Sequence, residues 1–155
     1  MASPEPPDDL LARFESGPAL VARAFAASPA AMLDFSQDGE WSIRDVLAHL
    51  ADAELVRAVR VRFILAQPTT ALSGFDEGAW HDRLGPAARS PLLALQLYEA
   101  TVATTAELVR VVGPPALAAS AHHESGELLT VQELLERGIN HALEHAAQIG
   151  RLEPR

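Results

Sequence analysis

The sequence of 155 residues contains no cysteine. Thiol nucleophiles, thiolate metal ligands, disulfides and redox switching by the protein's own side chains are therefore excluded. Any sulfur chemistry needs a sulfur atom that a substrate or cosubstrate brings in. A chain of this length can bury a core without disulfides. We expect one domain over residues 8–155, preceded by a disordered, proline-rich and acidic tail over residues 1–7.

Long hydrophobic runs and concentrated basic charge are also missing. No segment approaches the roughly 18 apolar residues of a membrane span, and MASPEPPDDL at the N-terminus lacks the basic and apolar regions of a signal peptide. The net charge is −9, with 21 acidic against 12 basic residues, which disfavours a nucleic-acid partner. We therefore expect a soluble, cytoplasmic protein that binds neither membranes nor nucleic acid.

Helical periodicity of apolar residues occurs in four long segments that are separated by glycine and proline. These segments are residues 8–28, 42–66, 90–113 and 130–152. Two of them begin with a capping box, in which Ser42 pairs with Asp45 and Thr130 pairs with Glu133. The Gly17-Pro18 pair predicts that the first segment is either kinked or split into two short helices.

The connecting segments show no alternation typical of strands. Residues 68–88 are rich in glycine, proline and aromatics, and we expect only a short helical turn there, around 76–84. Four long helices predict an all-α protein with the fold of an antiparallel four-helix bundle. The long link between the second and third long helices could cross over the bundle instead of turning tightly, which would change the topology.

Histidines are the residues that point to chemistry. His141 and His145 lie one turn apart in HALEHAAQIG, and His49 lies on a mostly apolar stripe of the second helix. Three neutral imidazoles without thiolates suit zinc, nickel, iron or copper, and leave coordination positions open for water or substrate. Alternatively, each is an ordinary hydrogen-bonded histidine. The remaining histidines, His81, His122 and His123, are expected at the surface.

Three segments carry a further pattern: WSIRDVLAHLADAE at 41–54, GFDEGAW at 74–80 and TVQELLERGINHALEHAAQIGRL at 130–152. Together they resemble the DinB-like superfamily of four-helix metalloproteins. The metal triad of that family, one histidine on the second helix and two on the last, corresponds to His49, His141 and His145. The resemblance implies that these residues hold a divalent ion, which we expect to be zinc, nickel or iron.

The resemblance also implies a small-molecule substrate and a homodimer. One branch of the superfamily uses a low-molecular-weight thiol such as bacillithiol or mycothiol, and other members resemble metal-dependent hydrolases. The implied function is a metal-dependent enzyme that activates a thiol, as an S-transferase, or water, as a hydrolase. The alternatives are a non-catalytic, stress-associated module that binds a metal or small ligand, and a purely structural helical dimer.

Two charged residues on the helix of His49 are candidate catalytic residues. Asp52, one turn after His49, could orient a ligand histidine or accept a proton, or it could simply be solvated. Arg60, on the same stripe as His49, could bind an anionic substrate or pair with a carboxylate such as Glu99. Trp80, between the second and third long helices, could wall the pocket or plug one end of the bundle.

Overall fold

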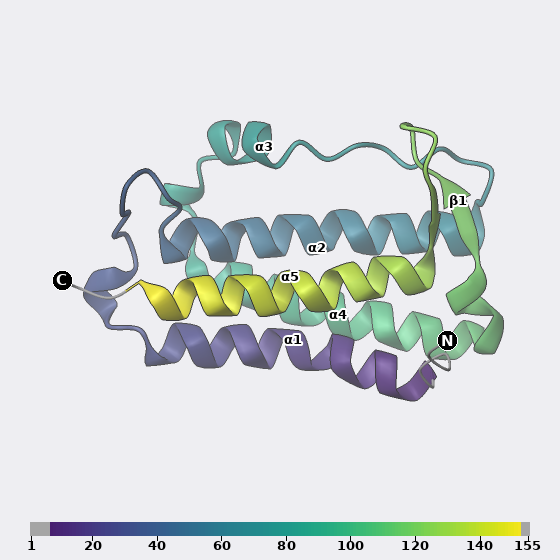
Figure 1. The fold of residues 1–155 in the computed structure, drawn as a ribbon, viewed down its shortest axis with the longest axis horizontal. Helices are drawn as coiled ribbons and strands as arrows, with labels where there is room; N and C mark the ends of the chain where they lie inside the picture. Colours follow the sequence, from purple (N-terminus) through teal and green to yellow (C-terminus); the bar gives the residue numbers. More distant parts are fainter. Residues whose placement is uncertain (1–6, 153–155) are drawn as a thin grey trace.

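The computed structural model describes residues 7–152. Its elements are, in order, α1 (Pro7–Ala27), α2 (Ile43–Ala66), α3 (Glu77–Arg83), α4 (Pro91–Val112), β1 (Ser120–His122), β2 (Leu128–Thr130) and α5 (Val131–Arg151), with 3-10 turns at Ala30–Met32, Pro86–Ala88 and Pro114–Ala118. The four long helices form a bundle, as predicted (Figure 1). The predicted tail, 1–7, lies outside the described residues except for Pro7, which begins α1.

The long helices run in two directions (Figure 1). Helices α1 and α5 point one way, and α2 and α4 point the other way. Each of α1 and α2 packs against both α4 and α5. The link of residues 67–90 returns along the length of the bundle, so α2 and α4 start at the same end. The crossover that the sequence left open is therefore the observed topology, and it lays α3 over the N-terminal half of α2.

Both predicted capping boxes are present. The Ser42 hydroxyl accepts a hydrogen bond from the Asp45 backbone N–H, and the Asp45 carboxylate accepts one from the Ser42 N–H, at the start of α2. Thr130 and Glu133 make the same pair of bonds at the start of α5. Each cap satisfies a first-turn N–H, typically worth about 1 kcal/mol. Local chemistry thus fixes where the two helices that carry the histidines begin.

Helix α1 is continuous through Gly17 and Pro18, so of the two alternatives predicted, a kink or a split into two helices, the split does not occur. Tertiary packing explains the continuity. A Cβ atom on Gly17 would lie 3.0 Å from the Ala142 Cβ and 3.2 Å from the Tyr98 hydroxyl, which shows how closely α1 approaches its neighbours. Pro18 is buried as well. Burial of this segment offsets the helical hydrogen bond that proline cannot make.

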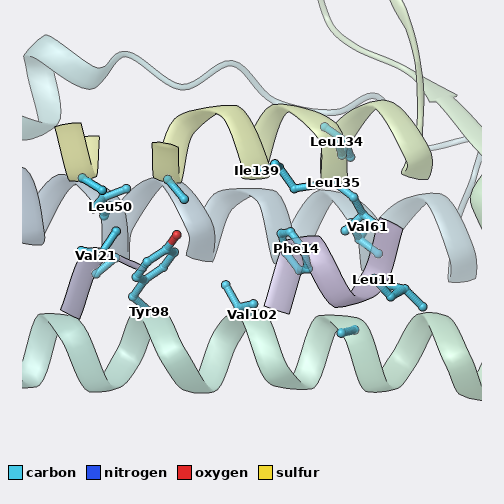
Figure 2. Packing of buried hydrophobic residues seen from close by; sticks show 14 of the residues in the cluster. Leu11, Phe14, Val21, Leu50, Val61, Tyr98, Val102, Leu134, Leu135 and Ile139 are labelled. Carbon is cyan, nitrogen blue, oxygen red and sulfur yellow. The ribbon is translucent and has the colours of Figure 1, made fainter. Parts of the chain in front are cut away.

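Apolar side chains from all four long helices fill the bundle (Figure 2). The labelled members are Leu11, Phe14, Val21, Leu50, Val61, Tyr98, Val102, Leu134, Leu135 and Ile139. Full burial of one such aliphatic or aromatic side chain contributes about 1.5–3 kcal/mol. The core therefore supplies the stability on which polar groups elsewhere in the bundle depend.

The link between α4 and α5 contains a β-hairpin that the sequence analysis did not predict. Strands β1 and β2 pair antiparallel, with Ala121 opposite Leu129. The Leu72 N–H donates to the His122 carbonyl, and the Glu124 N–H donates to the Leu72 carbonyl, which ties the crossover link to this hairpin. Strands of three residues are too short to show alternation. Within residues 7–152, no helix is long and apolar enough to cross a membrane.

Candidate metal centre

Three histidines from two helices meet at one point. The His49 Nε2 on α2 lies 2.8 Å from the His141 Nε2 on α5, and the His145 Nε2 lies 3.0 Å from that same atom. The ligand atoms of the three residues all lie within 4.8 Å of one another. The packing of α2 against α5 brings together residues that are 92 positions apart. The three histidines named from the sequence therefore form one cluster.

Burial keeps two of these imidazoles neutral. It is the main cause that lowers the pKa of His49 to about 4, with a smaller contribution from His145. Burial, followed by the influence of His145 and of Arg57, lowers the pKa of His141 to about 2. A neutral imidazole keeps a lone pair on one ring nitrogen, which is the form that binds metals. Both residues are therefore ready to act as ligands at neutral pH.

A glutamine orients the third imidazole. The His145 Nδ1 lies 2.7 Å from the Gln148 Oε1. Because an amide oxygen can only accept a hydrogen bond, the proton of a neutral His145 resides on Nδ1 and the lone pair on Nε2. That Nε2 is the atom that faces His141. Partners of this kind fix the tautomer and ring orientation of metal-ligating histidines. No motif in the sequence marks Gln148 for this role.

The donor set fits a divalent transition metal. The His141 Nε2 has a short contact with each of two other Nε2 atoms. One proton can form a hydrogen bond along only one of these two contacts. A cation between the three nitrogens can bind all three of them. Imidazole nitrogens bind zinc at about 2.0–2.1 Å and also suit nickel and iron. The cluster is therefore a candidate site for a divalent metal.

Aromatic rings wall the cluster. The Trp41 ring lies 4.9 Å from that of His49 and stacks on His81 at 4.7 Å between ring centroids. The Phe75 ring lies 6.4 Å from that of His49, and Trp80 packs edge-on against Phe75 at 4.9 Å between ring centroids. Trp80 lines the same small cavity as His49, which favours the pocket wall over the plug, the two alternatives considered from the sequence.

His81 is less exposed than the sequence analysis predicted. Its side chain is only 27 % exposed, because it stacks on Trp41 and lies 3.7 Å from the Asp45 carboxylate. His122 is exposed on the hairpin, as expected, and His123 is partly buried beside Ser125. The crossover link brings His81 next to the cluster, and no spacing along the chain indicates that proximity.

Asp52 is paired rather than solvated. Its two carboxylate oxygens accept hydrogen bonds from Arg89 at 2.6 and 2.8 Å, and the residue is buried. Arg89 follows the turn after α3, so this pair fastens the crossover link to α2. Asp52, Arg89 and His49 line one small cavity. The Asp52 charge raises the pKa of His49, against the stronger effect of burial.

A larger cavity of about 320 Å³ opens beside His141. Helices α2 and α5 form most of its walls, and Arg60 is one of the lining residues. The Arg60 guanidinium donates to the Ser73 carbonyl at 2.6 Å. Glu99, the partner considered from the sequence, is exposed on α4 and lines a different cavity, beside Pro18. Arg60 therefore faces the region next to the histidines rather than the far side of the bundle.

The fold and the histidine cluster define a class, a four-helix bundle with a candidate three-histidine metal centre. The family model of the DinB superfamily matches residues 13–149. The chain thus belongs to the DinB superfamily, which confirms the resemblance seen in the sequence.

The comparisons also find individual relatives. YfiT of Bacillus subtilis, a candidate metal-dependent hydrolase, is 26% identical over an alignment of 155 positions that covers 99% of this chain and 87% of YfiT. The solved structure of YfiT has what is described as an unusual four-helix bundle topology. It superposes with a TM-score of 0.87 over 98% of this chain and 88% of YfiT. The mycothiol-dependent maleylpyruvate isomerase superposes with a TM-score of 0.77 at 17% identity, over 97% of this chain and 64% of the isomerase, which shows a shared fold alone.

Proposed function

We propose that this protein is a metal-dependent hydrolase of small molecules, in which His49, His141 and His145 hold a divalent cation. The observation that carries the proposal is the convergence of three Nε2 atoms, with the pKa values of His49 and His141 held well below neutrality. The similarity to YfiT, a candidate metal-dependent hydrolase, supports water as the activated group. Zinc, nickel and iron are the ions that the donor set favours.

A divalent ion bound by three imidazoles lowers the pKa of a coordinated water or thiol and polarises an electrophilic oxygen. The chain's own residues prepare the site for that chemistry. Gln148 holds the tautomer of His145, and the rings of Trp41 and Phe75 shield His49 from bulk water. Exclusion of water strengthens every electrostatic interaction inside the site.

Asp52 enters the proposal as a positioning residue. Both of its oxygens are engaged by Arg89, so it is poorly placed to accept a proton. Glu77 is exposed and lines both the small cavity beside His49 and the larger one beside His141. We assign proton acceptance to Glu77, and we expect Glu77→Gln to lower kcat by about 10²-fold or more without loss of the ion.

Two alternatives use the same site. In an S-transferase, bacillithiol or mycothiol replaces water as the activated group, and the thiol comes from outside because the chain has no cysteine. The cavity of about 320 Å³ beside His141 offers room for such a cosubstrate. In a non-catalytic binding module, the ion is held and no substrate is turned over. A homodimer and a cytoplasmic location remain predictions.

The test is elemental analysis of untagged protein, purified without chelators and loaded with zinc, nickel or iron. We expect about one ion per chain, no ion in His49→Ala, and full occupancy in His122→Ala, whose histidine is exposed on the hairpin. Panels of esters and amides, and of thiols with electrophiles, then separate the reactions. Equal ion content in both variants would overturn the assignment of the metal centre. An occupied site with no turnover on either panel would favour the binding module.

A further inference from the structure

The cavity beside His141 is rich in arginine. Arg57 and Arg60 from α2 and Arg137 from α5 line it, and we call this space the arginine cavity. Arg137 lies one helical turn before His141 on α5, a rise of about 6 Å. The cavity therefore begins at the candidate metal centre and extends along the groove between the two helices.

A buried carboxylate holds the side chain of Arg57 in place. Its guanidinium pairs with Glu54, which is 1% exposed and lies inside the bundle. Gly138 on α5 leaves room for this side chain, since a Cβ atom there would lie 3.3 Å from the Arg57 Nη1. A buried carboxylate that fixes a guanidinium reduces the entropy lost when a ligand binds. Arg57 is thus a fixed positive group at the wall of the arginine cavity.

The other two arginines differ in their partners. Arg137 pairs with Glu127 at 2.6 Å on the surface. Arg60 donates to the Ser73 carbonyl, and its Nε–H is buried without an acceptor among the described residues. Burial, together with the positive charges of Arg57 and Arg137, lowers the pKa of Arg60, against the smaller opposite effect of Glu124. Among the described residues, no carboxylate forms an ion pair with Arg60.

The ion pairs of the lining indicate what kind of anion would bind in the arginine cavity. Arg57 and Arg137 already pair with Glu54 and Glu127, so Arg60 is the one arginine of the lining without an ion-pair partner among the described residues. A single carboxylate is enough to balance the Arg60 guanidinium. The planar guanidinium also matches a carboxylate with two parallel hydrogen bonds.

We propose that the arginine cavity binds a carboxylate group of the substrate, with Arg60 as the main contact, and so directs the reacting part of the molecule toward His141. The proposal rests on the metal-dependent function above, and it names the substrate class as small molecules that carry a carboxylate. It also gives Arg60 the role of a specificity-determining residue.

Binding of simple probes to zinc-loaded protein tests this proposal. Butyrate, its neutral amide butyramide and inorganic phosphate are titrated, with nitrogen-15 NMR of the arginine Nε–H groups and the Asn140 side-chain amide as the readout. We expect butyrate to shift these signals at concentrations at which butyramide does not, and phosphate to bind more weakly than butyrate. Arg60→Met should weaken butyrate binding about tenfold or more, because a charge-assisted pair is lost.

Arg62→Met is the matched control. Arg62 lies two residues further along α2, is exposed, and donates to the Ala58 carbonyl. Equal loss of binding in Arg60→Met and Arg62→Met, unchanged binding in Arg60→Met, or equal binding of butyrate and butyramide would each overturn the proposal. Tighter binding of phosphate would overturn the choice of a carboxylate.

Zinc content, measured on the same samples, separates this test from that of the proposed function. If the chain holds no zinc, the metal-dependent function fails, and the titration of metal-free protein still decides whether the arginine cavity binds carboxylates. If zinc is bound and butyrate binding does not depend on Arg60, only the carboxylate subsite fails. Unfolding by urea checks that Arg60→Met is as folded as the parent protein.

Discussion

The two sides of the bundle are built from different residues. Helices α1 and α4 contribute mainly apolar side chains to the core, such as Phe14, Val21 and Val102. The buried charged or imidazole groups within residues 7–152, His49, Asp52 and Glu54, all lie on α2, and the other two histidines of the cluster face them from α5. Desolvated polar groups of this kind cost stability, whereas apolar burial supplies it. Helices α2 and α5 also contribute apolar side chains to the core, so one side acts as scaffold alone and the other as both scaffold and site.

Truncation of the scaffold should have the largest effect on stability. Phe14 is 2% exposed and packs close to Gly138, where a Cβ atom would lie 2.8 Å from the phenyl ring. We expect Phe14→Ala to lower the free energy of unfolding by about 3–5 kcal/mol, because it removes buried area and leaves a cavity. Urea unfolding measures this change. Metal stoichiometry of the folded fraction should not change, and its loss would contradict the division into scaffold and site.

Removal of a ligand histidine should change the stability of the metal-free protein little and abolish the stabilisation by metal. We expect His49→Ala to change the unfolding free energy of metal-free protein by no more than about 1 kcal/mol, since it also removes a desolvated polar group. The parent protein should gain about 4 kcal/mol when the free metal concentration is 1,000 times Kd, and the variant should gain almost none. Thermal unfolding with and without zinc tests this. An equal gain in both proteins would show that zinc binds elsewhere.

Low pH should destabilise the metal-free protein because His49 and His141 are buried as neutral imidazoles. The folded-state pKa values of His49 and His141, about 4 and about 2, lie below the ordinary value of 6.5. Above pH 6.5 both histidines are neutral in both states, so stability is complete. As the pH falls from 6.5 toward 4 and lower, the unfolded chain takes up protons that the folded state excludes, and stability falls. Urea unfolding from pH 7.5 to 4.5 measures this loss, which should be smaller in His49→Gln.

Removal of Gln148, which hydrogen-bonds the ligand histidine His145, should have the smallest effect, a loss of metal affinity. Gln148→Ala leaves the three ligands in place but frees the tautomer and ring of His145. We expect metal affinity to fall about 10–100-fold, as measured by competition with a chelating indicator. Gln132→Ala is the matched control, because Gln132 lies on the same helix and donates to Glu136. If both variants keep the parent affinity, Gln148 does not support the site.

Most of the fold could be predicted because its signals are local. The residues of a capping box lie three positions apart, so Ser42 and Thr130 marked the starts of α2 and α5 to within a residue. The spacing of His141 and His145 likewise placed both on one helical face. The three-residue strands carried no comparable signal, and the packing of Gly17 prevailed over the tendency of Gly17-Pro18 to break α1.

The surroundings of the cluster could not be predicted, because they depend on the crossover. Arg89 meets Asp52 across 37 residues, and His81 meets Trp41 only because the link runs back along α2. The spacing of Glu54 and Arg57 was a readable signal for an ion pair on one helix. The burial of this pair could not be predicted, because it depends on how α2 packs against α4 and α5.

The most direct test of the account is a crystal structure of zinc-loaded protein, with anomalous diffraction data collected on both sides of the zinc absorption edge. We expect one anomalous peak, from a zinc ion bonded to the Nε2 atoms of His49, His141 and His145 at about 2.0–2.1 Å. A fully loaded crystal with the peak at other residues, or with the three histidines bonded only to one another, would contradict it.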